Sequence, residues 1–288
     1  MSIWERLGRI DRRIIYLILG VVVTIPLIVH IIIPIHPSPP AEKLFRVIDS
    51  IPPYSKALMI SVDYDPNTAP ELHPMAKALL RHAFKRHIRV CVLAWTITGI
   101  GLAENAIKDA SREINQNAET REDSVIYGRD YVFLGWTWPP LAWLLGMGES
   151  IAGVYPTDYY HNKTDTLELM RHIKKFRDVA ILVSLSGSST PFSYLAYSQN
   201  RYGLRVGAGI TAVSVADFYP YLQSGQFSGL LAGMKGAAEY EELVAEHCGV
   251  KRYRPATQAM SAQTFAHFLI IIFIIIGNIS YFIIRRRK

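Results

Sequence analysis

The chain has only two cysteines in 288 residues, Cys91 and Cys248, which excludes the disulfide framework of a small secreted domain. It also lacks the Walker A, HExxH, paired CxxC and EF-hand patterns, so the common phosphate and metal motifs are missing. We therefore expect no cofactor and no metal. Cys91 lies in an apolar run and is expected to be a buried thiol, although a bridge to Cys248 stays open.

Net positive charge is small in the part of the chain where a nucleic-acid-binding domain would need it. The net charge is +7, but residues 1–13 carry +2 of it and residues 285–288 carry +4. The remaining +1 belongs to the whole middle of the chain, and a nucleic-acid-binding domain needs a basic patch there. We therefore expect no nucleic-acid partner. Lys and Arg beside apolar stretches instead orient membrane spans.

Long apolar stretches are present at both ends of the chain. Residues 14–35 and 264–284 contain no Asp, Glu, Lys or Arg. At 1.5 Å per residue, each is long enough to cross a hydrocarbon core about 30 Å thick. The sequence thus predicts two transmembrane helices, with the lipid bilayer as a partner. The first exceeds the apolar region of a usual signal peptide and contains Pro26 and Pro34, which favours an uncleaved anchor.

The charges next to these stretches predict an orientation. The tails, residues 1–13 and 285–288, are short and basic and are therefore expected in the cytoplasm. Residues 36–55 are expected to form a proline-rich linker and a short helix. They lead into an extracytoplasmic domain at residues 56–262.

Small and polar residues in the two spans predict a contact between them. If the spans run antiparallel, Gly20 lies at about the depth of Gly277 and Asn278. Membrane helices pack through small residues and interhelical polar contacts. We therefore expect the two helices to approach closely at these positions.

Between the spans, apolar runs alternate with amphipathic helical segments. Strands are expected at residues 56–64, 88–95, 131–136, 151–155, 179–185 and 206–215. Helices are expected at 70–86, 102–118, 139–145, 167–175 and 191–199, with one broken helix or two across 219–248. The alternation predicts one α/β domain with a mainly parallel sheet flanked by helices, a Rossmann-like three-layer arrangement. Two smaller lobes, divided near residues 137–149, are the alternative.

Polar residues at the ends of the expected strands form a candidate ligand site, because open α/β sheets bind ligands beyond the carboxyl ends of their strands. These residues are Asp63, Asp65, Thr96, Thr98, Ser186, Ser188 and Asp217. Asp63 and Asp65 could share a divalent cation, although a capped turn before a helix explains Asp65 equally well. Ser188 could be a nucleophile with His161 and Asp158, or the serines could simply cap a helix.

Aromatic residues and glycines are concentrated in three segments, residues 135–145, 155–162 and 218–243. Aromatic residues are enriched at the centres of protein interfaces, so these segments predict an apolar association surface. The sequence therefore favours a non-enzymatic two-span membrane protein whose outer domain forms a homo-oligomer or scaffolds membrane-protein partners. The alternatives are a membrane-anchored ligand-binding or sensing domain, and a membrane-anchored hydrolase or metal-dependent enzyme using the strand-end cleft.

Overall fold

The computed structural model describes residues 10–120, 122–252 and 254–286. The chain divides into two units: an α/β unit, Ile35–Ala256, and a terminal unit made of Met1–Pro34 and Thr257–Lys288. The α/β unit begins earlier than the expected residue 56 because the helix α3 (Pro39–Asp49) packs against the sheet. The short helix expected within residues 36–55 is α3, and it belongs to this unit.

The terminal unit contains two helices, α2 (Arg12–Val29) and α13 (Pro255–Arg286). Both are long and apolar enough to cross a membrane. Most of their apolar side chains are exposed, including Leu17 and Phe268. This exposure distinguishes them from the buried core helix of a soluble protein.

The expected contact between the two apolar helices is not seen at the predicted residues. A Cβ added to Gly20 or to Gly277 would meet no atom within 4 Å, and Asn278 is exposed. Close packing there stays a prediction. The two segments of the terminal unit contact each other at another place. There, the amide of Ile33 donates a 3.0 Å hydrogen bond to Oγ of Ser261 in α13.

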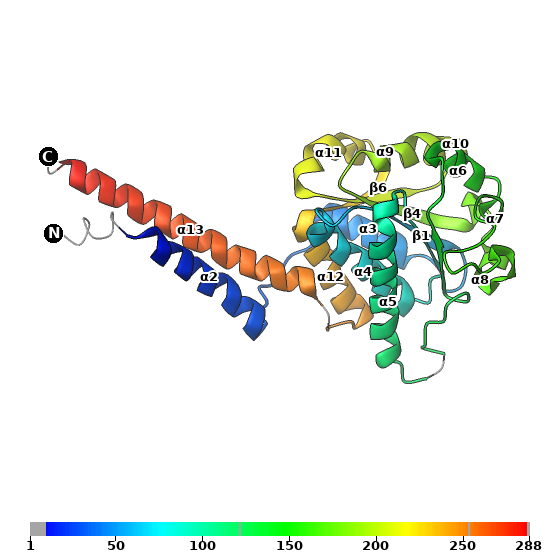
Figure 1. The fold of residues 1–288 in the computed structure, drawn as a ribbon, viewed down its shortest axis with the longest axis horizontal. Coiled ribbons are helices and arrows are strands. Elements are labelled where there is room, and N and C mark those ends of the chain that lie inside the picture. Colours follow the sequence, from blue (N-terminus) through cyan, green and yellow to red (C-terminus); the bar gives the residue numbers. More distant parts are fainter. Residues whose placement is uncertain (1–9, 121, 253, 287–288) are drawn as a thin grey trace. The chain divides into compact units, whose positions relative to one another are not determined.

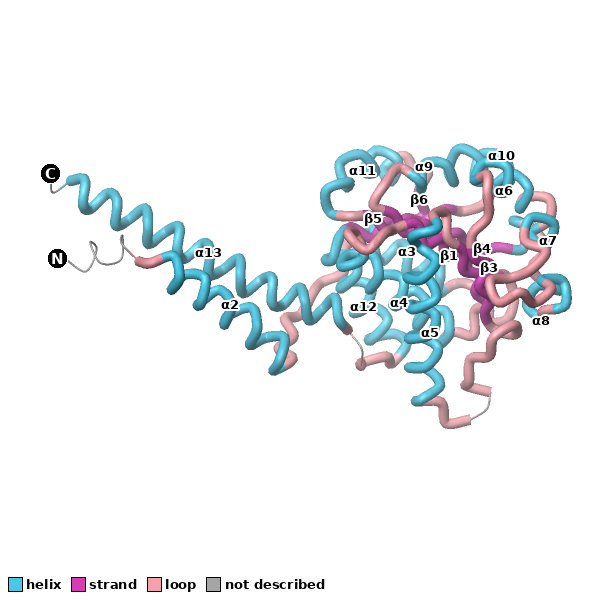
Figure 2. The backbone as a smooth tube through the Cα atoms, in the orientation of Figure 1, coloured by secondary structure: helices cyan, strands magenta, loops and turns pink. Residues whose placement is uncertain are grey.

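The α/β unit is built on one six-stranded sheet in the order β3-β2-β1-β4-β5-β6 (Figure 2). Its strands are β1 (Ala57–Asp63), β2 (Val90–Leu93), β3 (Tyr131–Gly135), β4 (Val179–Ser186), β5 (Val206–Ile210) and β6 (Phe227–Ala232). All neighbouring strands are parallel. The predicted α/β fold is confirmed, and all six strands belong to one sheet, not to two lobes.

Helices cover both faces of the sheet, which explains why the strands are apolar on both sides (Figure 1). One face carries α3, α4 (Ala69–Lys85), α5 (Ile100–Gln116) and α12 (Gly233–Cys248). The other carries α6 (Pro140–Met147), α9 (Thr190–Tyr194), α10 (Asn200–Tyr202) and α11 (Val215–Gln223). Two short helices, α7 (Ile151–Val154) and α8 (Glu168–His172), lie in the crossover from β3 to β4.

Shorter helical turns complete the fold. They are the 3-10 turns Ile97–Gly99, Thr164–Thr166, Phe176–Asp178 and Ala212–Ser214 and the π-helical turn Leu195–Gln199.

Two expectations about secondary structure are wrong. Residues 151–155, expected as a strand, form α7, whose first turn is capped by Oγ of Ser150. Residues 219–248, expected to be helical, contain β6 between α11 and α12. The strand depends on packing from far along the chain: a Cβ on Gly229 would lie 2.5 Å from Cβ of Leu44 in α3.

Both ends of the α/β unit are fixed to the same helix. Near the entry, Oγ of Ser38 donates a 2.7 Å hydrogen bond to Oε2 of Glu239 in α12. At the exit, the amide of Ala256 donates to Oε1 of Glu241 at 3.2 Å. The chain therefore enters and leaves the unit beside α12.

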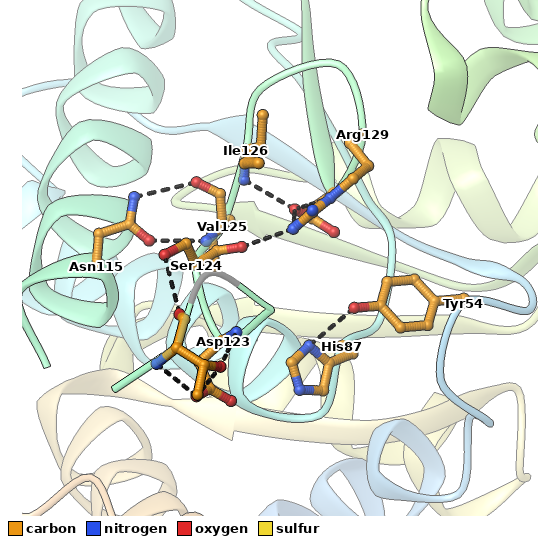
Figure 3. Close-up of polar contacts among 10 residues, drawn as sticks. Tyr54, His87, Asn115, Asp123, Ser124, Val125, Ile126 and Arg129 are labelled. Carbon is orange, nitrogen blue, oxygen red and sulfur yellow. Dashed lines mark hydrogen bonds and ion pairs between the residues drawn. The ribbon is translucent and has the colours of Figure 1, made fainter. Parts of the chain in front are cut away.

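Polar contacts at the amino edge of the sheet hold the connection from α5 to β3 (Figure 3). Asn115 exchanges two hydrogen bonds with Val125: its Nδ2 donates to the carbonyl at 3.0 Å, and its Oδ1 accepts from the amide at 2.7 Å. Arg129 donates from a guanidinium nitrogen to the carbonyl of Ser124 at 2.6 Å. These side chains fix a loop, and the switch point of the sheet lies at the opposite edge.

Candidate functional site

Asp63 is the last residue of β1 and lies at the switch point of the sheet, between β1 and β4. Its buried carboxylate accepts hydrogen bonds from Oγ of Ser61 at 2.5 Å and Oγ of Ser184 at 2.7 Å. The amide of Trp95, which follows β2, donates a third at 2.9 Å. Ser61 pairs with Ser184 across the two strands, and the two-residue strand period puts Ser61 and Asp63 on one face.

The environment of Asp63 favours its neutral form. Burial raises the pKa of this carboxyl to about 7, although the hydrogen bonds from Ser61, Ser184 and Trp95 oppose the shift. All three donors are neutral, so they offset only part of the cost of burying a charge. Asp63 therefore exchanges its proton near neutral pH.

A buried aromatic shell surrounds this carboxyl. The hydroxyl of Tyr194 lies 2.6 Å from Oγ of Ser61, which extends the hydrogen-bonded chain from Asp63. We call Ser61, Asp63, Ser184 and Tyr194 the Asp63 cluster. The ring of Trp143 packs 6.5 Å from that of Tyr194 and 6.4 Å from that of Tyr155.

Two donors in this shell have no partner. The hydroxyl of Tyr155 and Nε1 of Trp143 are buried and make no hydrogen bond. Burial raises the pKa of the Tyr155 hydroxyl, and the nearby Asp63 charge adds to that shift, which places the two groups in one electrostatic environment. Unpaired buried donors need an explanation such as a water or a small bound acceptor.

Asp65 caps the turn before α4. Its Oδ1 accepts from the amide of Asn67 at 2.9 Å and from the amide of Thr68 at 3.2 Å. The capped-turn interpretation therefore explains this residue. Among the residues that the structure describes, the group of three ligand-type side chains able to hold a metal contains neither Asp65 nor Asp63.

The predicted serines and threonines form two small groups, one at the end of β4 and one after β2. Buried Ser186 lies with its Oγ 3.4 Å from the carbonyl of Asp63 and accepts from the amide of exposed Ser188 at 3.0 Å. In the loop after β2, Oγ1 of Thr98 donates to Oγ1 of Thr96 at 3.2 Å. The structure thus brings the serines to Asp63 and leaves the two threonines in the adjacent loop.

Asp217 does not belong to the site. The strand expected through residue 215 ends at Ile210, and Asp217 is exposed in the first turn of α11. A carboxylate in the first turn of a helix is favoured by the helix dipole, which accounts for its position.

The possible nucleophile arrangement is not assembled either. The carboxylate of Asp158 accepts from the hydroxyl of Tyr127 at 2.5 Å and from the amide and side chain of Asn162. None of the hydrogen bonds described for Asp158 joins its carboxylate to the ring of His161, so Asp158 does not orient that ring. The loop also pairs with β3, because the amide of residue 159 donates to the carbonyl of residue 133, whereas Ser188 follows β4.

Exposed apolar side chains follow several strands at the same edge of the sheet. The three most exposed large apolar residues of the described α/β unit are Val213 at 90%, Trp138 at 70% and Ile97 at 64%. They follow β5, β3 and β2, respectively. We define the carboxyl-edge rim as Ile97, Trp138, Leu141, Val213, Tyr219 and Tyr221, all exposed.

The aromatic segments singled out from the sequence are divided between this rim and the core. Trp138 and Tyr219 are exposed, whereas Trp143, Phe227 and Tyr240 are buried. Aromatic content alone therefore does not distinguish surface residues from core residues, because the same residue types fill the core.

Sequence reasoning missed most of the Asp63 cluster. Ser61 and Ser184 are polar residues inside otherwise apolar strands, and each faces the same layer as Asp63. A buried serine two residues before a strand-end aspartate was the available signal. Tyr194 and Tyr155 had none, since they belong to two different crossovers that only the fold brings together.

Comparison of the chain with protein-family models, with curated proteins and with solved structures gives no match.

Proposed function

We propose that this protein is a non-enzymatic membrane protein, anchored by α2 and α13, whose α/β unit lies outside the cytoplasm and associates with a second copy through the carboxyl-edge rim. Its main support is the exposure of Val213, Trp138 and Ile97. Exposed apolar side chains that gather at one edge mark association sites. Trp and Tyr are also enriched where protein interfaces are most buried.

The charge of the rim favours a second copy as the partner. The loops at residues 95–100, 136–141 and 187–193 contain no charged residue, and the loop at 211–224 contains only Asp217. Two copies can therefore bring these surfaces together with little like-charge repulsion. A two-fold axis would place the same patch on both sides of the interface, the commonest arrangement in soluble oligomers.

Anchoring at both ends supports the same interpretation. Most of the apolar side chains of α2 and α13 are exposed, which favours an apolar surrounding. The basic tails favour cytoplasmic termini. Copies held in one membrane meet at a high effective concentration, so a modest interface would suffice for association.

The native mass of the full-length protein in mild detergent tests the proposal. We expect a dimer or a larger discrete oligomer for the wild type and a monomer for Val213→Glu, which places a charge in the rim without touching the core. The matched control is Ile126→Glu, because Ile126 is also exposed but lies at the amino edge. A monomeric wild type, or equal masses for the two variants, would contradict the proposal.

A second candidate function is the binding of a small acceptor in the aromatic shell beside the Asp63 cluster. The observation that favours it is the pair of buried unpaired donors on Tyr155 and Trp143. If these donors bind nothing, Tyr155→Phe removes an unsatisfied group and leaves stability unchanged or raised. If they hold an acceptor, the same change lowers the free energy of unfolding by about 1 kcal/mol. Urea unfolding of the full-length protein distinguishes the two outcomes.

A further inference from the structure

Three potential metal ligands converge on the opposite side of the α/β unit from the Asp63 cluster, where α3, α4 and α12 end. Asp49, His82 and Cys248 each place one ligand atom within 4.8 Å of the other two. Nε2 of His82 lies 3.1 Å from Oδ1 of Asp49. Both cysteines are free thiols, so Cys248 is not bridged to Cys91.

His82 is held in place by contacts on both ring nitrogens. The ring is fully buried and stacks on the ring of Phe45, with 4.3 Å between the ring centroids. Its Nδ1 lies 2.7 Å from the hydroxyl of Tyr240, and a tyrosine hydroxyl can donate or accept. Nε2 faces the Asp49 carboxylate, which only accepts, so in the absence of an ion Nε2 carries the ring proton and Nδ1 accepts from the Tyr240 hydroxyl. Binding of an ion at Nε2 requires this proton to move to Nδ1, where the Tyr240 hydroxyl then accepts it. Such a second contact is what orients metal-binding histidines.

The backbone favours a cation at this place. Asp49 is the last residue of α3 and Cys248 is the last residue of α12, while His82 lies in the last turn of α4. Each helix carries the negative end of its dipole at its carboxyl terminus. Three such ends meeting beside a carboxylate create a field that stabilises positive charge.

Arg86 now supplies that positive charge. Its Nε donates to Oδ1 of Asp49 at 2.7 Å, the same oxygen that faces His82. The Arg86 side chain is 39% exposed, so it can turn out into solvent without breaking a packed core. Asp49 and Cys248 are also only partly buried, which gives an ion a path to the three ligands.

We propose that Asp49, His82 and Cys248 bind a Zn²⁺ ion, with Arg86 displaced into solvent. A Cys, a His and a carboxylate are ligand types that Zn²⁺ prefers, and a water molecule would complete four-coordination. The Cys248 thiol gives its proton to solvent when the ion binds. The proposal is independent of the association through the carboxyl-edge rim.

Cobalt is the spectroscopic probe for this site. In chelator-treated full-length protein in detergent, we expect Co²⁺ to give a thiolate-to-metal charge-transfer band that saturates at one equivalent and is lost on adding Zn²⁺. Cys248→Ser should abolish the band. Cys91→Ser should keep it, because Cys91 is buried in β2 away from the ligands. No band in the wild type, or an equal band in Cys248→Ser, would overturn the proposal.

Arg86→Met provides a second measurement that does not depend on the folding of the cysteine variants. Removing the competing guanidinium should tighten Co²⁺ binding about tenfold, since a positive charge beside the carboxylate opposes the ion. Unchanged or weaker binding would show that the ion does not replace Arg86 and would also overturn the proposal.

Discussion

Oγ of Ser184 lies 2.7 Å from Oδ2 of Asp63, so β4 donates a hydrogen bond across the switch point to the terminal residue of β1. The hydrogen bond joins two strands that are 121 residues apart in the chain. A neutral donor offsets only part of the cost of burying a charged carboxylate. The stability of the folded protein therefore depends on whether Asp63 carries its proton.

Asp63→Asn should change how the stability of the α/β unit depends on pH. The pKa of Asp63 is raised from 3.8 to about 7, so the folded state holds the proton more tightly than the unfolded state. The protonated Asp63 carboxyl therefore contributes fully to the stability of the wild type below about pH 4. This contribution is lost as the pH rises to about 7. Asn cannot ionise. We compare the free energy of unfolding of Asp63→Asn with that of the wild type at each pH. This difference should be more favourable to the variant at pH 8 than at pH 4, by about 4 kcal/mol.

Urea unfolding of the full-length protein in detergent, followed by tryptophan fluorescence at both pH values, checks this difference. The effect is contradicted if the two proteins differ by the same amount at pH 4 and at pH 8.

Ser184→Ala should destabilise the protein more at alkaline than at acidic pH. The hydroxyl of Ser184 lowers the pKa of Asp63, so its loss raises that pKa further. We expect a cost of about 1–3 kcal/mol at pH 8, where the carboxylate is charged, and a smaller one at pH 4. In the Asp63→Asn background the pH dependence of this cost should vanish, as a double-mutant cycle would show.

Gly99→Ala should be destabilising although the residue lies in a helical turn. A Cβ at Gly99 would lie 2.4 Å from the carbonyl oxygen of Val62 in β1, so the loop after β2 would have to move. We expect a loss of about 1–3 kcal/mol in the free energy of unfolding.

Gly101→Ala is the matched control for that substitution. It lies two residues later, in α5, and a Cβ there meets no atom within 4 Å. Alanine should stabilise the helix by about 0.5–1 kcal/mol. Equal effects at positions 99 and 101 would show that the approach of the loop to Val62 is not what constrains Gly99.

Protease added to intact cells should cut the α/β unit and leave both tails protected. The expectation follows from the basic charge of residues 1–13 and 285–288. Epitope tags at each terminus, compared before and after permeabilisation, report the two tails separately. Protection of the α/β unit in intact cells would reverse the proposed orientation.

The fold could be predicted where a strand is a continuous apolar run between turn signals. Residues 179–185 were predicted as a strand and form most of β4, because a strand covered on both faces needs no polar alternation. β6 gave no such signal, since Ser228 and Gly229 interrupt it. Its glycine is required by α3, which precedes it by about 180 residues and approaches too closely for a side chain.

The candidate site divides in a similar way. Asp63 and Ser186 could be found because a parallel sheet brings its strand ends to one edge. Asp217 could not be excluded, since the run from 206 to 215 does not show that β5 stops at Ile210. The ligands Asp49, His82 and Cys248 end or flank three different helices, and only the packing of those helices on the sheet brings them together.

The shared attachment of Ser38 and Ala256 to α12 has a consequence for local unfolding. Both ends of the α/β unit hydrogen-bond to carboxylates of this one helix. Local unfolding of α12 would therefore loosen the two ends of the unit together, although they are far apart in the chain.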